Sequence, residues 1–146
     1  MLPRWHIILG AIFTIILWIA VPGISFFYLI LDFFASFLID VDHYVASIIN
    51  SGRIISLKDS FEYHRIKEIQ QQKEISRGIR KKSDFHLFHT LEFHLLVGLL
   101  GIFWIGFFYI FIGMVFHSLI DIYDGLRKGW LHRREFFFFN WLAKRF

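Results

Sequence analysis

The sequence predicts an all-α, polytopic membrane protein, a bundle of four transmembrane helices arranged as two hairpins that a basic, partly helical cytoplasmic loop joins. Three observations predict this class. The chain of 146 residues is 56% hydrophobic and 21% aromatic, with a mean hydropathy of +0.54, whereas soluble domains are about 45–50% apolar. Its two long apolar blocks contain no Lys or Arg. The length suits a single membrane domain, 1–146, and the absence of cysteine excludes a disulfide framework.

The first apolar block runs from Trp5 to Ile39 and contains Asp32 as its only acidic residue. One crossing needs about 20 mainly apolar residues, so the block is long enough for two. Pro22 and Gly23 lie near its middle, where a proline without a backbone donor and a conformationally free glycine favour a turn. We therefore expect one helix near 3–21 and a second near 24–45.

The second apolar block, Phe85 to Tyr123, could form one crossing or two, and the charges decide between them. Residues 50–84 contain nine basic residues and residues 125–146 contain six. A single crossing would put these segments on opposite sides of the membrane, against the positive-inside tendency. A hairpin that turns near Trp104 to Phe107 instead puts all 16 Lys and Arg on one side. We therefore expect helices near 85–104 and 107–125, with the N- and C-termini both cytoplasmic.

The two basic segments have their own patterns. Within the cytoplasmic loop 50–84, residues 59–79 alternate apolar and charged side chains as an amphipathic helix does. This helix would lie on the membrane surface or form a solvated linker, and a role as a lid over the site stays open. The tail, 126–146, combines four consecutive phenylalanines with a tryptophan and cations, a composition typical of the membrane interface.

Three clusters of His, Asp and Glu are expected at one depth. They occupy residues 40–43 at the end of the second helix, 86–94 at the start of the third and 117–124 at the end of the fourth. The topology derived from charge places all three at the cytoplasmic end of the bundle. Ionisable groups in membrane segments usually face the interior or a wet cavity. Residues three or four apart share a helix face, so each cluster presents several side chains in one direction.

These residue types predict a metal site. Imidazole and carboxylate groups bind divalent transition metals, zinc first and manganese as an alternative, and two ions about 3.5–4 Å apart can clamp a phosphoryl group. We expect one or two ions. The candidate ligands are Asp40, Asp42, His43, His89, Glu92, His117 and Asp121. Glu92 or Asp42 is the candidate catalytic base, and Asp42 can join Asp40 at one centre only where the helix ends or distorts. Ligand, supporting and structural roles stay open for His86, His94, Asp32 and Asp124.

Three short motifs resemble those of one family. They are Asp40-Val41-Asp42-His43, His89-Thr90-Leu91 and Gly113-Met114-Val115-Phe116-His117-Ser118-Leu119-Ile120-Asp121. In this order the motifs resemble the YdjM-like family of bacterial and archaeal membrane-bound metal-dependent hydrolases, which includes LexA-regulated members. The resemblance implies a small helical membrane hydrolase similar to the zinc-dependent phospholipase C superfamily.

The sequence therefore predicts an integral, multi-pass membrane protein that cleaves a phosphoester of a lipid or lipid-linked substrate at the cytoplasmic face. Its expected partner is an anionic or phosphate-bearing membrane lipid, with no nucleic acid, and homo-oligomers remain an option. The main alternative is a non-hydrolytic metal-binding or ion-transporting protein. A scaffold whose basic loop binds anionic lipid is the third interpretation.

Overall fold

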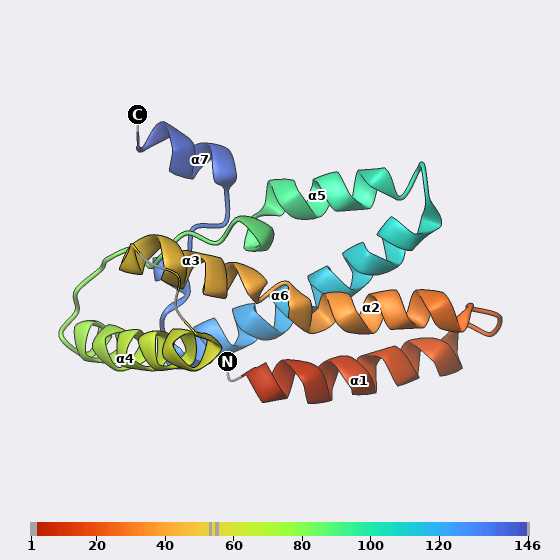
Figure 1. Ribbon diagram of the computed structural model, residues 1–146, viewed down its shortest axis with the longest axis horizontal. Helices are drawn as coiled ribbons and strands as arrows, with labels where there is room; N and C mark the ends of the chain where they lie inside the picture. Colours follow the sequence, from red (N-terminus) through yellow and green to blue (C-terminus); the bar gives the residue numbers. More distant parts are fainter. Residues whose placement is uncertain (1–2, 53, 55, 146) are drawn as a thin grey trace.

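The computed structural model describes residues 3–52, 54 and 56–145, and these residues form helices and turns without a strand. The all-α class expected from the sequence is confirmed. In chain order the elements are α1 (Pro3–Ala20), α2 (Phe26–Leu38), α3 (Val41–Ser51), α4 (Leu57–Ser76), the 3₁₀ turn η1 (Leu87–His89), α5 (Leu91–Leu100), α6 (Ile105–Lys128), η2 (Leu131–Arg133) and α7 (Phe138–Ala143) (Figure 1). Arg53 of the basic loop and Phe146 of the tail lie outside the described residues.

Two helical hairpins form the long part of the molecule (Figure 1). In the first, α1 packs on α2 and the turn contains Gly23, whose φ of +93° is accessible mainly to glycine. In the second, α5 packs on α6. The hairpins meet where α6 packs on α2, and α1 also contacts α6 through the stacked rings of Phe13 and Phe116.

The predicted second helix, 24–45, is divided in the structure. α2 ends at Leu38, and a turn over Ile39 and Asp40 precedes α3, which begins at Val41. The side chain of Asp42 accepts a hydrogen bond from the backbone N–H of Phe88, 46 residues away. The break is therefore associated with a distant contact that no local pattern contains.

The predicted third helix, 85–104, is also divided, and it is shorter. Thr90 is extended, with φ −83° and ψ 150°, and its hydroxyl accepts from the backbone N–H of Phe93 as the N-cap of α5. α5 ends at Leu100, so the turn precedes the predicted position near Trp104 to Phe107. The ring of Trp104 covers Gly106, where a Cβ would lie 2.4 Å from it, and α6 begins between these residues, at Ile105. α6 then runs to Lys128, one turn beyond the predicted end of 107–125.

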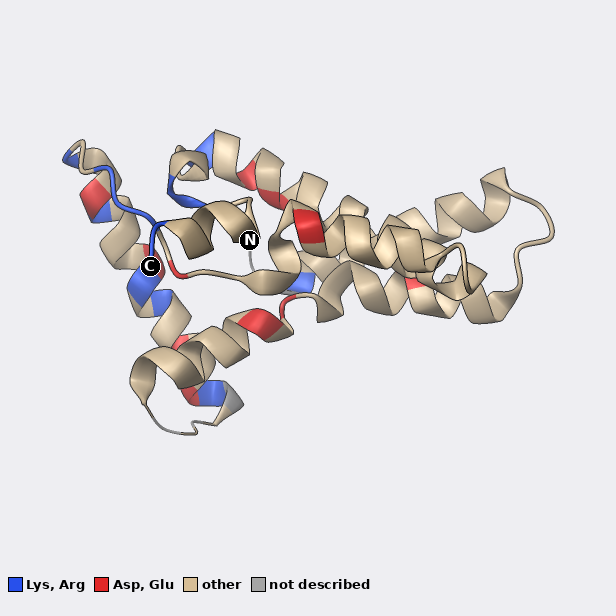
Figure 2. Cartoon of the chain, turned by 90° about the horizontal axis from the view of Figure 1, so that it is seen from above, with Lys and Arg blue, Asp and Glu red and all other residues tan. Residues whose placement is uncertain are grey.

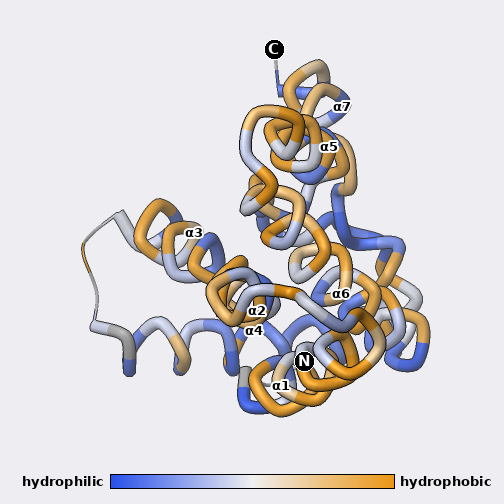
Figure 3. The backbone as a smooth tube through the Cα atoms, turned by 90° about the vertical axis from the view of Figure 1, so that its right-hand side faces the viewer, coloured by the Kyte–Doolittle hydropathy of each residue, from blue (hydrophilic) through white to orange (hydrophobic). Residues whose placement is uncertain are grey.

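Polar and apolar side chains are distributed unusually over this fold. Five hydrophobic residues are buried among the described side chains, whereas fourteen polar or charged ones are buried. Large apolar side chains on α1, α2, α5 and α6 are exposed instead, among them Ile16, Phe26, Leu99 and Ile105. Figure 3 shows these helices as largely hydrophobic tubes, whereas α4 is mostly hydrophilic. Charged residues gather at the end of the molecule that also contains the start of α1 and α7 (Figure 2).

Close contact between α2 and α6 depends on Gly113. A Cβ at this position would lie 2.3 Å from the backbone oxygen of Asp32 and 3.0 Å from Cβ of Ala35. The missing side chain lets the two backbones approach. His117, one turn after Gly113, is thereby brought against the last turns of α2.

Among the described residues, one helix, α6, is long and apolar enough to cross a membrane, and little more than a quarter of its apolar stretch is buried. The apolar runs Arg4–Ala20 of α1 and Leu91–Leu100 of α5 are shorter than this requirement.

Candidate metal centre

The charged end of the bundle brings together side chains from α2–α3, η1 and α6. The turn over Ile39 and Asp40 directs Asp40 toward the His residues of η1 and α6. α3 then begins, and Asp42 lies on its buried face. The distortion that the sequence required for Asp40 and Asp42 to serve one site is therefore present.

Four ligand-type atoms converge at this place: His89 Nε2, His117 Nε2, Asp40 Oδ1 and Asp121 Oδ2. The two nitrogens are 3.1 Å apart. Asp40 Oδ1 lies 3.6 Å from His89 Nε2 and 3.4 Å from His117 Nε2. Asp121 Oδ2 lies 3.7 Å and 3.5 Å from the same two atoms. In a tetrahedral site with bonds of about 2.0–2.2 Å, donor atoms are about 3.3–3.6 Å apart. The five separations between the imidazole nitrogens and the two carboxylate oxygens lie close to that range.

The outer nitrogens of both imidazoles are held by acceptors. His89 Nδ1 is 2.9 Å from Asp42 Oδ2, and His117 Nδ1 is 2.9 Å from the backbone oxygen of Ser36. Neither acceptor can donate, so both Nδ1 atoms carry hydrogen. In the neutral rings, both Nε2 lone pairs then point at each other across 3.1 Å. A cation between them removes that repulsion, and an outer carboxylate or carbonyl on the second nitrogen is the usual support of a metal-binding His.

The charge balance also favours a cation. Asp40, Asp42 and Asp121 place three carboxylates around the two imidazoles, and Arg134 supplies one guanidinium, with Nη1 3.0 Å from Asp121 Oδ2. The excess is two negative charges when all three carboxylates are ionised, which a divalent ion would neutralise. His89, His117 and Asp121 are buried, whereas Asp40 is partly exposed. The site is therefore open on the Asp40 side.

Two supporting residues were not among the sequence candidates. The His6 ring stacks on His117, with centroids 4.1 Å apart, and its Nε2 lies 3.4 Å from Asp121 Oδ1. The position of His6 at the cytoplasmic end of the first predicted helix was an available signal. Arg134 follows η2 in an irregular segment, and no pattern in the sequence places it against Asp121.

Glu92 is not part of this centre, which corrects its assignment as ligand and as base. Its two carboxylate oxygens accept from the backbone N–H groups of Phe138 and Phe139 at 2.9 and 3.3 Å, at the start of α7. The prediction assumed one continuous helix with His89 and Glu92 on one face. The break at Thr90 separates them, so Glu92 anchors α7 instead.

Asp42 also differs from its predicted role as a base. Its Oδ2 accepts from His89 and from the backbone of Phe88, so this oxygen orients the ring of His89, a candidate ligand. His43 lies beside the centre, with Nε2 3.4 Å from Asp40 Oδ1. His94 is elsewhere: its ring nitrogens lie within 3.3 Å of the backbone oxygens of Thr90 and Met114, which is a structural arrangement.

The remaining open residues are also placed. Asp124 is buried and pairs with Lys128 at 3.1 Å. Asp32 is fully buried in α2, where Thr14 donates to it at 2.8 Å. Neither belongs to the four-atom cluster.

Two neighbouring histidines have opposite pKa shifts. Burial lowers the pKa of His86 to about 4, and its nearest carboxylate oxygen, on Asp42, is 3.7 Å away. Burial acts in the same direction on His89, but the carboxylates of Asp40 and Asp42 beside it outweigh burial and raise the pKa of His89 above its usual value. Protons and cations therefore compete for His89 Nε2.

A cleft of about 660 Å³ opens onto Asp40, His43, His86 and His89, with α4 along one side. Its lining also includes apolar residues at the ends of α1 and α2, Ile7, Phe37 and Leu38. The cleft could therefore admit a molecule with a polar and an apolar part. Comparisons with family models, with curated proteins and with solved structures find no match to this chain. The candidate metal centre therefore rests on its own geometry.

Proposed function

We propose that this protein is a membrane-embedded, metal-dependent hydrolase that cleaves a phosphoester of an anionic or phosphate-bearing lipid at the cytoplasmic face. The observation that carries the proposal is a pair of imidazole nitrogens, 3.1 Å apart, with an oxygen of Asp40 and an oxygen of Asp121 each within 3.7 Å of both. The outer hydrogens of both rings are already bound. Zinc suits this donor set best, because it accepts nitrogen and oxygen ligands in tetrahedral geometry. The resemblance of three motifs to membrane-bound metal-dependent hydrolases favours the same chemistry.

The membrane location is supported by the distribution of side chains. Helices α1, α2, α5 and α6 expose large apolar residues, whereas the bundle interior contains Asp32, His6 and His117. An exposed apolar surface of this extent would be unfavourable in water. We propose that these four helices cross the bilayer as two hairpins, with the charged end cytoplasmic because the Lys and Arg among the described residues gather there (Figure 2).

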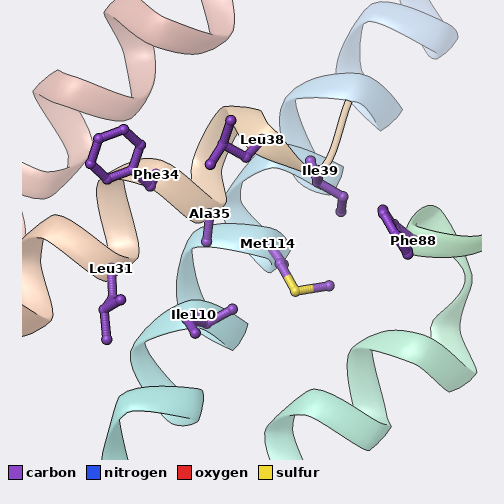
Figure 4. Close-up of a pocket in the computed structure, with 8 residues that line it drawn as sticks. All are labelled: Leu31, Phe34, Ala35, Leu38, Ile39, Phe88, Ile110 and Met114. Carbon is purple, nitrogen blue, oxygen red and sulfur yellow. The ribbon is translucent and has the colours of Figure 1, made fainter. Parts of the chain in front are cut away.

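An apolar groove supports a lipid as the substrate. Figure 4 shows its eight lining residues, all without charge or hydrogen-bonding groups on their side chains: Leu31, Phe34, Ala35, Leu38, Ile39, Phe88, Ile110 and Met114. The volume is about 320 Å³. Ile39 and Phe88 lie at one side of the groove (Figure 4), and each directly precedes a proposed ligand, Asp40 and His89. An acyl chain in this groove would hold its phosphate group beside the metal centre.

In this proposal, different residues hold the ion, orient the two imidazole rings and orient the phosphate group. His89, His117, Asp40 and Asp121 would hold the ion, while Asp42 and the Ser36 carbonyl fix the two rings. A bound divalent ion supplies Lewis-acid activation of water and neutralises charge on a phosphoryl oxygen. Arg134 is buried against Asp121 and lines the cleft, so its guanidinium is available to orient a phosphate oxygen.

The test combines metal analysis with a lipid assay. Purified full-length protein should contain a transition metal by plasma mass spectrometry and should release a water-soluble phosphate product from phosphoester lipids in mixed micelles. A variant with both His89→Ala and His117→Ala should lose the ion that these two residues hold, and with it the activity, but keep its helical circular dichroism. The matched control is His132→Ala, because His132 is exposed and belongs to none of the His and Asp groups that could hold an ion.

Two results would contradict the proposal. Lipid hydrolysis that continues in the folded double variant would separate the activity from this site. Metal in the parent without hydrolysis of any phosphoester lipid would favour the non-hydrolytic metal-binding alternative.

Topology has an independent test, because the chain contains no cysteine. Arg80→Cys puts one thiol on the basic segment, and Ile102→Cys puts one at the tip of the second hairpin, where the side chain is 80% exposed. In intact cells, an impermeant thiol reagent should label only the second variant. Labelling of Arg80→Cys from outside would overturn the orientation.

A further inference from the structure

Two buried ligand-type atoms beside the metal centre lack hydrogen-bond partners. They are Asp42 Oδ1 and His86 Nδ1. They lie 3.7 Å apart, which is too long for a hydrogen bond between them. A buried polar atom without a partner costs about 1–3 kcal/mol, so two such atoms facing one another call for a third group.

His43 completes a set of three with these atoms. One nitrogen of His43 lies within 4.8 Å of the ligand atoms of Asp42 and His86, and the rings of His43 and His86 are 3.9 Å apart. His43 Nε2 also lies 3.4 Å from Asp40 Oδ1, which belongs to the four-atom cluster. Asp40 and Asp42 therefore link the two sets: Asp40 lies next to His43, and Asp42 lies next to His89.

We propose that Asp42, His43 and His86 form a second divalent transition-metal site, adjacent to the first and facing the same cleft. Asp42 uses its two oxygens differently: Oδ2 fixes the ring of His89, and Oδ1 is a ligand of the second site. Asp42 is only 5% exposed, so bulk water does not hydrogen-bond its unpartnered Oδ1.

The second site deepens the proposed function, on which its catalytic meaning rests. A pair of cations suits a phosphoryl group better than one, since two positive centres can stabilise both the attacking and the leaving oxygens. The three residues would have to offer neutral nitrogens and an ionised oxygen. The low pKa of His86, about 4 because of burial, is compatible with that requirement.

The experiment is metal stoichiometry on full-length protein, loaded with excess Zn²⁺, freed of unbound ion by gel filtration and measured by plasma mass spectrometry. The parent and the His132→Ala control should hold two equivalents. His86→Ala should hold one, and should keep the ion that His117 binds. Circular dichroism and elution volume verify folding.

A second measurement covers the case in which His86→Ala does not fold. The parent loaded with Mn²⁺ should give the electron paramagnetic resonance spectrum of a spin-coupled pair, in place of the six-line spectrum of isolated ions.

The outcomes separate the two proposals. One equivalent in the parent, unchanged in His86→Ala, overturns the second site and leaves the proposed function standing. Two equivalents in the parent that persist in His86→Ala overturn the assignment to these residues. No metal in the parent overturns both proposals.

Discussion

Two polar clusters, one on α2 and one beginning at the turn that follows it, differ in which groups surround their carboxylates. In the apolar half of the bundle, Thr14 donates to Asp32 Oδ2 at 2.8 Å, and the pair includes no nitrogen ligand. At the charged end, Asp40 meets His89 and His117 from two other elements, and their outer nitrogens are already engaged. Burial is equally deep for Asp32 and His117. The difference teaches that burial of an ionisable group does not identify a metal site, whereas convergence of lone pairs from separate elements does.

The largest expected effect is at His117. His117→Ala removes one of four ligands and leaves His89 facing two carboxylates, so the first ion should be lost. Calorimetric titration with Zn²⁺ should show affinity reduced by more than the 10–100-fold typical of outer-partner changes. Affinity within tenfold of the parent in the folded variant would mean that His117 is structural, as Asp32 is.

Asp42→Asn changes a supporting group. The amide keeps the shape but lacks the charge that fixes and polarises His89, so Zn²⁺ affinity at the first site should decrease about 10–100-fold. The matched control is Glu62→Gln, which removes a charge from an exposed ion pair on α4. Equal effects in the two variants would indicate that only net charge matters.

Gly113→Ala tests whether the apolar half positions the metal centre. A Cβ 2.3 Å from the Asp32 oxygen forces α6 away from α2, so the free energy of unfolding in detergent should decrease by about 1–3 kcal/mol. Zn²⁺ affinity should decrease as well, because His117 would move relative to the Ser36 carbonyl. Gly98→Ala is the control, since its Cβ meets only the Phe111 ring, at 3.3 Å. If Gly113→Ala lowers stability but leaves affinity unchanged, the two regions are independent.

The pH dependence follows from His89. Its pKa is raised by the neighbouring carboxylates of Asp40 and Asp42, which outweigh burial, so protonation begins above the usual value of about 6.5. The ion needs the unprotonated Nε2, and Zn²⁺ affinity should therefore decrease as the pH falls through that pKa, by up to about tenfold per pH unit. Titrations at three pH values between 6 and 8.5 would measure this slope. A flat profile would mean that His89 is not a ligand.

The smallest effect is expected at Asp32. In Asp32→Asn the amide oxygen can still accept from Thr14, so stability should change by less than about 1 kcal/mol and metal content should not change. Thermal unfolding and metal analysis would measure both. Loss of metal from this variant would erase the distinction between the two clusters.

The sequence predicted part of the centre for physical reasons that are local. His117 and Asp121 are four apart on α6, a regular helix, so their shared face followed from helical geometry. The turn at Gly23 followed from glycine and proline chemistry. Glu92 was misassigned because the same geometry was applied across Thr90, where the backbone is extended.

By itself the sequence determined an all-α chain, the first hairpin turn and the His and Asp side chains that can bind a metal, because composition and helical period are properties of neighbouring residues. Only the tertiary structure decided where the helices break. It also placed Arg134 and His6 beside Asp121, and it placed Glu92 at the start of α7 instead of at the metal centre. These outcomes depend on contacts such as that between Asp42 and His89, 47 residues apart. Such contacts form when separate elements pack, so no local pattern encodes them.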